Sequence, residues 1–135
     1  MAKLGADIAA RPEERFKSLL IRLGAKSWHQ ADFDAAPLWR DVTVNNAVFD
    51  HLWGEVFRDI DIRKGLNALT APVLLALGRS DYLVAPASTW DEYRESFADL
   101  TVRTFEKSGH TPQLEESDLF DEVLLSFLGK EPDRG

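Results

Sequence analysis

The sequence predicts an α/β fold in which a helical half precedes two parallel strands, each followed by a helix. Three observations support this prediction. Apolar residues recur at helical spacing before residue 70, a continuous apolar run at 73–77 ends in a glycine, and a second strand-like run follows at 100–107. The order strand–helix–strand–helix is typical of a parallel sheet with a right-handed crossover.

The helical half, residues 1–70, is expected to hold two helices. The first begins near Pro12, a residue suited to a first helical turn, and ends near Gly24. Its apolar face consists of Phe16, Leu19, Leu20 and Leu23. The second helix begins near Asn45 or Asn46, and one of its faces carries Val48, Leu52 and Val56. The aromatic-rich stretch 25–41 between the helices predicts no regular element.

The C-terminal half, residues 71–130, is expected to supply the sheet, and 131–135 a short tail. The run "VLLAL" at 73–77 has the continuous apolar character of a strand buried on both faces. A helix is expected at 87–100, where Ser88 and Asp91 have the spacing of a capping box. The last helix is expected to begin near Ser117. Its apolar face consists of Leu119, Phe120, Val123, Leu124, Phe127 and Leu128.

Composition limits the classes of function. The 135-residue chain has a net charge of −7 and dispersed basic residues, which argues against a nucleic-acid-binding face. The absence of cysteine excludes disulfides, thiol catalysis and cysteine-based metal sites. The first residues lack the apolar core of a signal peptide, and "VLLAL" is too short to cross a bilayer. We therefore expect a cytoplasmic protein with no nucleic-acid or membrane partner.

Two candidate functional residues follow the two predicted strands. The first strand leads into "GRSD", which contains Asp81, and the second leads into "KSGH", which contains His110. Because functional residues of parallel sheets gather at the carboxyl ends of the strands, these side chains are expected to meet. An acid bound to one imidazole nitrogen leaves the other nitrogen free as a base. Spacing alone leaves open that both are ordinary polar loop residues.

The sequence segments around these residues are similar to those of a known protein family. "APVLLALGRSDYLVAP" followed by "FEKSGHTPQLEESDLFDEVLLSFL" resembles the C-terminal part of α/β-hydrolase fold proteins, most closely the proline-iminopeptidase-like branch. The resemblance implies a partial α/β-hydrolase fold whose helical half is cap-like. It implies that Asp81 is the acid and His110 the base of a catalytic triad. It also implies a small peptide or ester substrate and no cofactor.

The sequence departs from this family in its nucleophile. The triad order is Ser, Asp, His, with the serine on a G-x-S-x-G turn, and neither that motif nor an HGG-like segment occurs here. Ser80, in "GRSDY", is interpreted as a turn residue. We therefore expect the back half of a hydrolase, whose partner is the missing N-terminal half. The alternatives are a non-catalytic remnant that associates with itself or another polypeptide, and a relative such as an esterase or dehalogenase.

Other polar and aromatic residues have weaker predicted roles. Iminopeptidases of this branch hold the substrate's α-amine with cap carboxylates, so the resemblance makes Glu55 a substrate-binding candidate, together with Trp53 and Tyr82. His29 and His51 are expected to be packing or surface residues, because no histidine and carboxylate set has metal-ligand spacing.

The adjacent carboxylates Glu115 and Glu116 precede the last predicted helix. They are expected to begin that helix and favour its dipole rather than take part in proton transfer.

Overall fold

A computed structural model describes residues 2–129 of the chain, which divides into two compact units. The first unit contains Met1–Ala25 and Asp32–Asp61, and the second contains Lys26–Ala31 and the chain from Ile62 onward. The helical elements before the first strand run to Ala68, near the expected end of the helical half at residue 70, although the contacts assign 26–31 and the residues from 62 onward to the second unit. The expected tail at 131–135 lies outside the described residues.

The first unit is helical. The helix expected from Pro12 to Gly24 is divided into a 3₁₀ turn and two α-helices, although Pro12 does occupy the first turn. The elements are α1 (Ala2–Ala10), η1 (Pro12–Glu14), α2 (Arg15–Arg22), α3 (Gly24–Ser27), η2 (Ala36–Trp39), α4 (Asn46–His51) and the π-helical η3 (Leu52–Val56). The last two residues of α3 belong to the second unit.

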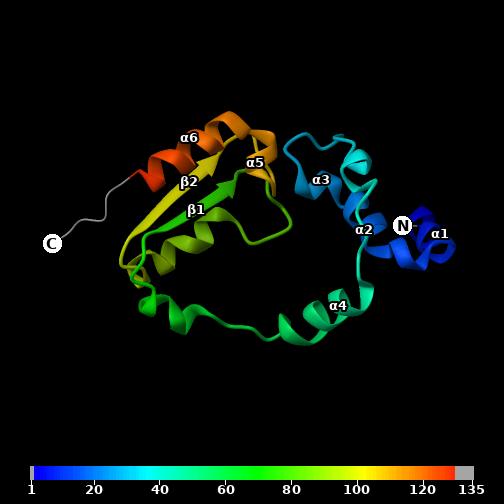
Figure 1. The fold of residues 1–135 in the computed structure, drawn as a ribbon, viewed down its shortest axis with the longest axis horizontal. Coiled ribbons are helices and arrows are strands. Elements are labelled where there is room, and N and C mark those ends of the chain that lie inside the picture. Colours follow the sequence, from blue (N-terminus) through cyan, green and yellow to red (C-terminus); the bar gives the residue numbers. More distant parts are fainter. Residues whose placement is uncertain (1, 130–135) are drawn as a thin grey trace. The chain divides into compact units, whose positions relative to one another are not determined.

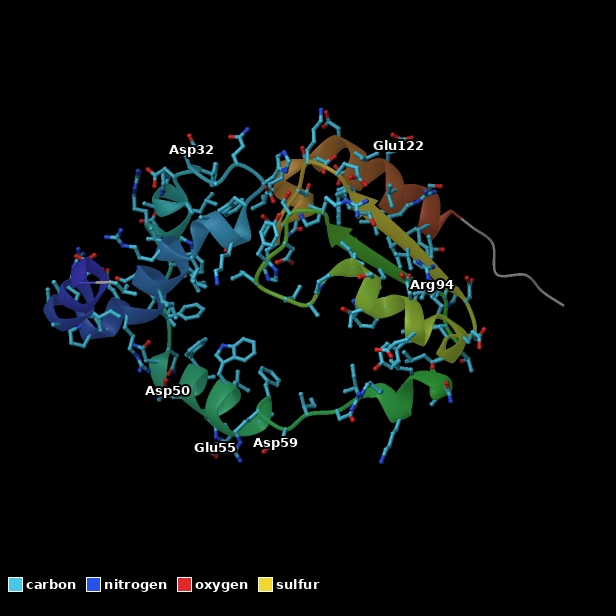
Figure 2. The ribbon with its side chains drawn as sticks, turned by 180° about the vertical axis from the view of Figure 1, so that it is seen from behind. Asp32, Asp50, Glu55, Asp59, Arg94 and Glu122 are labelled. Carbon is cyan, nitrogen blue, oxygen red and sulfur yellow. The ribbon has the colours of Figure 1, made fainter. Side chains whose placement is uncertain are left out.

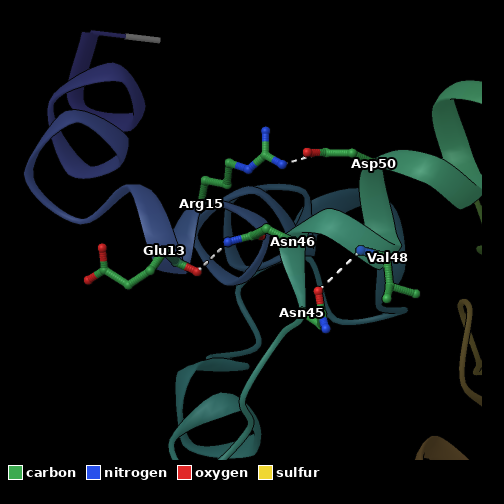
Figure 3. Close-up of polar contacts among 6 residues, drawn as sticks. All are labelled: Glu13, Arg15, Asn45, Asn46, Val48 and Asp50. Carbon is green, nitrogen blue, oxygen red and sulfur yellow. Dashed lines mark hydrogen bonds and ion pairs between the residues drawn. The ribbon is translucent and has the colours of Figure 1, made fainter.

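Polar contacts fix the start of α4 (Figure 3). Asn45 is its N-cap, and the Asn45 side chain accepts a 3.2 Å hydrogen bond from the Val48 amide. This confirms the predicted start, because an Asn side chain satisfies one of the free amides of a first turn. The Asn46 side-chain amide donates to the Glu13 carbonyl at 2.9 Å, and Arg15 pairs with Asp50. These contacts join α4 to η1 and α2.

An aromatic row packs along the same helices. The Phe16 ring lies 4.2 Å from the Phe49 ring and 5.9 Å from the Trp39 ring, centroid to centroid. Phe49 continues to Trp53 at 5.8 Å, and Trp53 to Phe57 at 4.9 Å. These spacings are typical of favourable tilted and edge-on ring pairs.

The second unit is built on a parallel pair of strands. Strand β1 (Val73–Gly78) pairs with β2 (Leu100–Phe105) in the register Val73↔Leu100 to Gly78↔Phe105. Both arrows point toward the end of the sheet where α5 lies (Figure 1). The other elements are η4 (Arg63–Ala68), η5 (Ala87–Ser96), α5 (Pro112–Glu115) and α6 (Ser117–Leu128). The expected strand–helix–strand–helix order is therefore present.

Two details of this unit differ from the sequence expectation. Residues 87–96 form a 3₁₀ helix rather than an α-helix. Its cap position is held by Pro86, whose side chain cannot accept a hydrogen bond, so Ser88 lies inside the first turn and the expected capping box is absent. The six residues of β1 are half-buried rather than buried on both faces, because the sheet has two strands within the described part of the chain.

Helix α6 begins at Ser117 as predicted and packs on the sheet through Phe105. The Phe105 side chain at the end of β2 is 1% exposed, and its ring centroid lies 5.8 Å from that of Phe120. The half-buried apolar residues of the helix are Phe120, Val123, Leu124 and Phe127. Leu119 and Leu128, expected on the same face, are exposed. Within residues 2–129, no helix has the length and apolar character needed to span a membrane.

Candidate active site

Asp81 and His110 meet at the carboxyl end of the two strands. The Nδ1 atom of His110 lies 2.8 Å from the Oδ2 atom of Asp81, so the predicted contact is present. The Asp81 side chain is 12% exposed and that of His110 is 47% exposed. The other oxygen of Asp81, Oδ1, accepts a 2.9 Å hydrogen bond from the Leu83 amide. Each oxygen of this carboxylate therefore has its own partner.

The loops that carry this pair approach each other through their backbones. The Arg79 amide donates to the Phe105 carbonyl at 2.9 Å, and the Ser80 amide donates to the Ser108 carbonyl at the same distance. A Cβ atom at Gly78 would overlap the carbonyl of Gly109. Both chain segments can come this close only because residue 78 has no side chain. The strand pairing is thus extended into the two functional turns.

Two carboxylates hold the His110 loop. Glu115 accepts a 2.7 Å hydrogen bond from the Gly109 amide, and Glu116 accepts bonds from the Lys107 amide at 2.9 Å and the Ser108 hydroxyl at 2.6 Å. Sequence reasoning assigned both residues only to the helix start and its dipole, and it missed these contacts. Their position before the last helix was a signal of capping, but it did not indicate which amides they would bind.

A segment from the first half of the sequence, Lys26–Ala31, completes the site. The Ser27 carbonyl accepts a 2.6 Å hydrogen bond from the His110 amide, and the Lys26 carbonyl accepts one of 2.9 Å from the Tyr82 amide. A Cβ atom at Gly109 would overlap the Ser27 carbonyl, so this approach also requires a glycine. Both functional turns are therefore bonded to the same short segment.

His29 extends this segment toward Ser80. Its ring atom Nδ1 lies 2.9 Å from the Ser80 hydroxyl, and its amide donates to Glu115 at 2.7 Å. His29 is exposed, as expected of a surface residue, but it belongs to the second unit rather than to the cap-like half in which the sequence placed it. Ser80 lies in the turn after β1, as expected. No periodic pattern marks a contact between residues 51 positions apart.

Tyr82 lies beside Asp81 and is 68% exposed. Both residues line a pocket of about 290 Å³, together with Leu77, Pro86 and Ser88. A second pocket of about 320 Å³ shares part of its lining, including Leu77, with the first and extends to residues of η4 and η5. The volumes are near the lower end of the range for small-molecule sites.

The other predicted binding residues belong to the first unit. Trp53 is 57% exposed, and Glu55 lies on the π-helical turn η3 (Figure 2). The Glu55 carboxylate is 3.1 Å from Nδ1 of His51, one helical turn earlier. His51 is therefore a surface residue with an acidic partner. Within residues 2–129, no group of three histidine or acidic side chains is arranged to bind a metal ion.

An exposed ion pair flanks the site. Arg79 donates two hydrogen bonds to Glu106, at 2.8 and 3.0 Å. The hydrogen bond from Arg79 lowers the pKa of Glu106 below its usual value, and that from Glu106 raises the pKa of Arg79. Because Arg79 follows β1 and Glu106 follows β2, this exposed pair links the carboxyl ends of the two strands.

Comparison with known proteins identifies the family. The model of the α/β hydrolase fold family matches residues 17–117. The chain belongs to this family. Its acid and base candidates both lie inside the matched range, as do the two strands that carry them.

Relatives of this α/β-hydrolase chain are longer than it is. The AB hydrolase superfamily protein YclE of Bacillus subtilis (strain 168) is 43% identical over 125 residues, which is 93% of this chain and 44% of the relative. The chain thus spans less than half of this curated relative.

Solved structures share its fold. An esterase from Exiguobacterium antarcticum has a TM-score of 0.65 and 24% identity, over 96% of this chain and 48% of the esterase. An alpha/beta fold family hydrolase from Bacillus anthracis str. Sterne has a TM-score of 0.62 and 22% identity, over 85% of this chain and 42% of that protein. At these identities the similarity establishes a partial α/β-hydrolase fold and nothing about substrates.

Proposed function

We propose that Asp81 and His110 are the acid and base of a serine-hydrolase triad. The observation that carries this proposal is the 2.8 Å contact between His110 Nδ1 and Asp81 Oδ2 at the carboxyl ends of two parallel strands. A carboxylate at Nδ1 favours the tautomer with its proton on that atom, so Nε2 is left with a lone pair. The nucleophilic serine is supplied from outside these 135 residues, in which no G-x-S-x-G motif occurs.

The proposed reaction is hydrolysis through an acyl-enzyme. Nε2 of His110 removes the serine proton as the serine oxygen bonds to the acyl carbon, and it then gives that proton to the leaving group. A water molecule then attacks the acyl carbon of the acyl-enzyme while His110 takes its proton. His110 returns that proton to the serine oxygen, which releases the carboxylic acid and the free serine. Asp81 stays ionised and stabilises the imidazolium that forms twice in each cycle. This chemistry requires no cofactor.

Ser80 is a poor candidate for the nucleophile. Its hydroxyl contacts His29 rather than His110, and its amide is already bonded to the Ser108 carbonyl. An oxyanion would need free donors at such a position, and their loss costs on the order of 10²–10³ in rate. The alternative hypothesis is that Ser80 is the nucleophile and His29 its base. It predicts that the isolated chain is labelled at Ser80.

The proposed substrates are aminoacyl amides of small peptides, or small esters. An amine-binding role is assigned to Glu55, and substrate contacts are assigned to Trp53 of the first unit and, separately, to Tyr82 of the second. The exposure of the Trp53 and Tyr82 rings supports their availability to a ligand. Glu55→Gln should weaken aminoacyl anilide hydrolysis and leave hydrolysis of p-nitrophenyl esters unchanged, because only the former substrate carries an α-amine.

The test is a chimera in which this chain replaces the matched 125-residue stretch of the Bacillus subtilis relative. Labelling with a fluorophosphonate, which reacts with activated serines, reports the triad independently of substrate. We expect His110→Gln to abolish labelling and Glu122→Gln, an exposed change on α6, to leave it intact. The 135-residue chain alone should not be labelled.

Three outcomes would contradict the proposal. Labelling of the isolated chain at Ser80, removed by His29→Gln, would place the nucleophile inside it. A labelled chimera indifferent to His110→Gln would remove the base. A folded chimera that is not labelled by the probe and hydrolyses neither esters nor aminoacyl anilides would favour the non-catalytic association module.

A further inference from the structure

The Glu115 carboxylate binds two segments that are distant in sequence. One oxygen, Oε2, accepts the Gly109 amide, and the other, Oε1, accepts the His29 amide, both at 2.7 Å. Glu115 is half-buried, and hydrogen bonds from an amide to an ionised carboxylate are about twice as strong as neutral ones. It is therefore placed to hold the two segments at a set separation.

Each of these segments continues to one member of the acid–base pair. Gly109 directly precedes His110, and His29 contacts the hydroxyl of Ser80, which directly precedes Asp81. The contact between His110 and Asp81 closes the path. The result is a ring of contacts in which Glu115 lies opposite the acid–base pair and touches neither of its members.

Glu116 also accepts two hydrogen bonds, but both come from the same loop. Its partners are Lys107 and Ser108, both in the His110 loop. Glu116 thus stabilises one turn, whereas Glu115 connects that turn to the segment that holds the other. This difference provides a matched control, because the two residues are adjacent and each binds two groups.

We propose that Glu115 is a positioning residue that sets the distance between Asp81 and His110. It does so by tying the Lys26–Ala31 segment to the His110 loop. The catalytic consequence rests on the proposed hydrolase function, but the structural consequence does not. Loss of the carboxylate frees the Gly109 and His29 amides together, so the His110 and His29 rings lose a shared support and keep their contacts with Asp81 and Ser80.

Histidine-selective ¹⁵N labelling of the 135-residue chain tests the structural part. The chain has three histidines, so the ring signals can be assigned with one His→Gln variant each. We expect Glu115→Ala to shift the signals of both His29 and His110 and to speed exchange of the Nδ1 proton of His110. His51, which belongs to the first unit, is the internal reference and should not change.

Matched variants separate positioning from general loosening. Glu115→Gln keeps one acceptor oxygen and should give a smaller change of the same signals. Glu116→Gln should leave the His29 signal in place, and Glu122→Gln on α6 should change none of the three (Figure 2). Unchanged His29 and His110 signals in Glu115→Ala would overturn the proposal. A simultaneous change at His51 in both Glu115 variants would also overturn it, since Glu115 would then support the fold as a whole.

Kinetics of the chimera test the catalytic part. Glu115→Ala should lower kcat by on the order of 10², the effect of misplacing a catalytic group by about 1 Å, and leave KM unchanged. Because the ring signals require no turnover, a chimera without activity would contradict the hydrolase function and leave the structural result standing. A changed KM with an unchanged kcat would show that Glu115 acts on substrate binding instead.

Discussion

Asp81 uses its two oxygens for different purposes. Oδ1 binds the Leu83 amide of its own turn, and Oδ2 faces the imidazole of His110. The turn and the histidine therefore each hold one oxygen of the acid before any substrate is present. Such preorganisation matters because a catalytic group must be held within a narrow geometry to be effective.

Asp81→Asn should lower kcat of the chimera by about 10⁴. An asparagine can keep the contact with Nδ1, but its amide group can favour the wrong imidazole tautomer, in which Nε2 carries the proton and cannot act as a base. The matched control is Asp91→Asn, which alters an exposed aspartate paired with Arg94 on η5. A loss of less than tenfold for Asp81→Asn would indicate that the carboxylate has no role in orienting the base.

The acid–base contact could be predicted from the sequence, but the groups around it could not. Parallel strands bring their carboxyl ends together, so two polar residues that follow them become neighbours by topology alone. The contacts of His29 with Ser80 and Glu115 join residues 51 and 86 positions apart through irregular chain. Such loop contacts depend on backbone geometry that no periodic pattern records.

Among the elements, the strands were predicted more accurately than the helices. A continuous apolar run and its glycine correctly located β1, whose last residue is Gly78. The capping-box spacing of Ser88 and Asp91 predicted an α-helix, yet residues 87–96 form a 3₁₀ helix with Pro86 at its cap position. A spacing of three residues suits both helix types, so the pattern could not distinguish them.

Gly78→Ala should destabilise the second unit by about 1–3 kcal/mol, the cost of overpacking. The new methyl group would meet the backbone of Gly109, which cannot move without breaking the pairing of the two turns. Gly65→Ala in η4 is the control, because nothing lies within 4 Å of the added methyl group. Urea unfolding of the two variants measures the difference. Equal stabilities would show that the turns are not held as closely as described.

The Arg79–Glu106 pair should contribute stability that depends on pH. Because Arg79 lowers the folded-state pKa of Glu106, the contribution is present above the unfolded pKa and is lost as the pH falls through the lower, folded-state pKa. The wild-type chain should therefore melt slightly above Glu106→Gln at about pH 7, and the two should converge at about pH 3. Both side chains are exposed, so 1 M salt should also reduce the difference. A gap that persists at the acidic pH would contradict this assignment.

Few apolar side chains are buried where the structure describes them, over residues 4–129. They are Trp28, Ala35, Leu66 and Phe105. Full burial of a leucine-sized side chain contributes about 1.5–3 kcal/mol, so three left exposed forfeit ~5–9 kcal/mol. The net stability of a domain is only ~5–15 kcal/mol. A chain with this surface has a strong drive to cover it.

We therefore expect the isolated chain to be dimeric or larger, or partly molten, with β1 at the contact. The residues of β1 are half-buried, and its second edge has no partner strand among the described residues, so it offers both apolar surface and backbone groups for pairing. Light scattering across a dilution series, together with near-UV circular dichroism, measures association and tertiary packing. A monomer that survives dilution and retains a strong near-UV spectrum would show that the exposed surface needs no partner.

The two carboxylates before α6 also connect that helix mechanically to the loop of His110. Glu115 and Glu116 bind the loop of His110 directly, and α6 begins at the next residue. A force applied along α6 would reach that loop through two amides and one hydroxyl as well as along the chain itself. Detachment of the helix would withdraw these contacts from the loop of the base and leave His110 bonded to Ser27 and Asp81, so we expect the last helix to tighten the site rather than to form it.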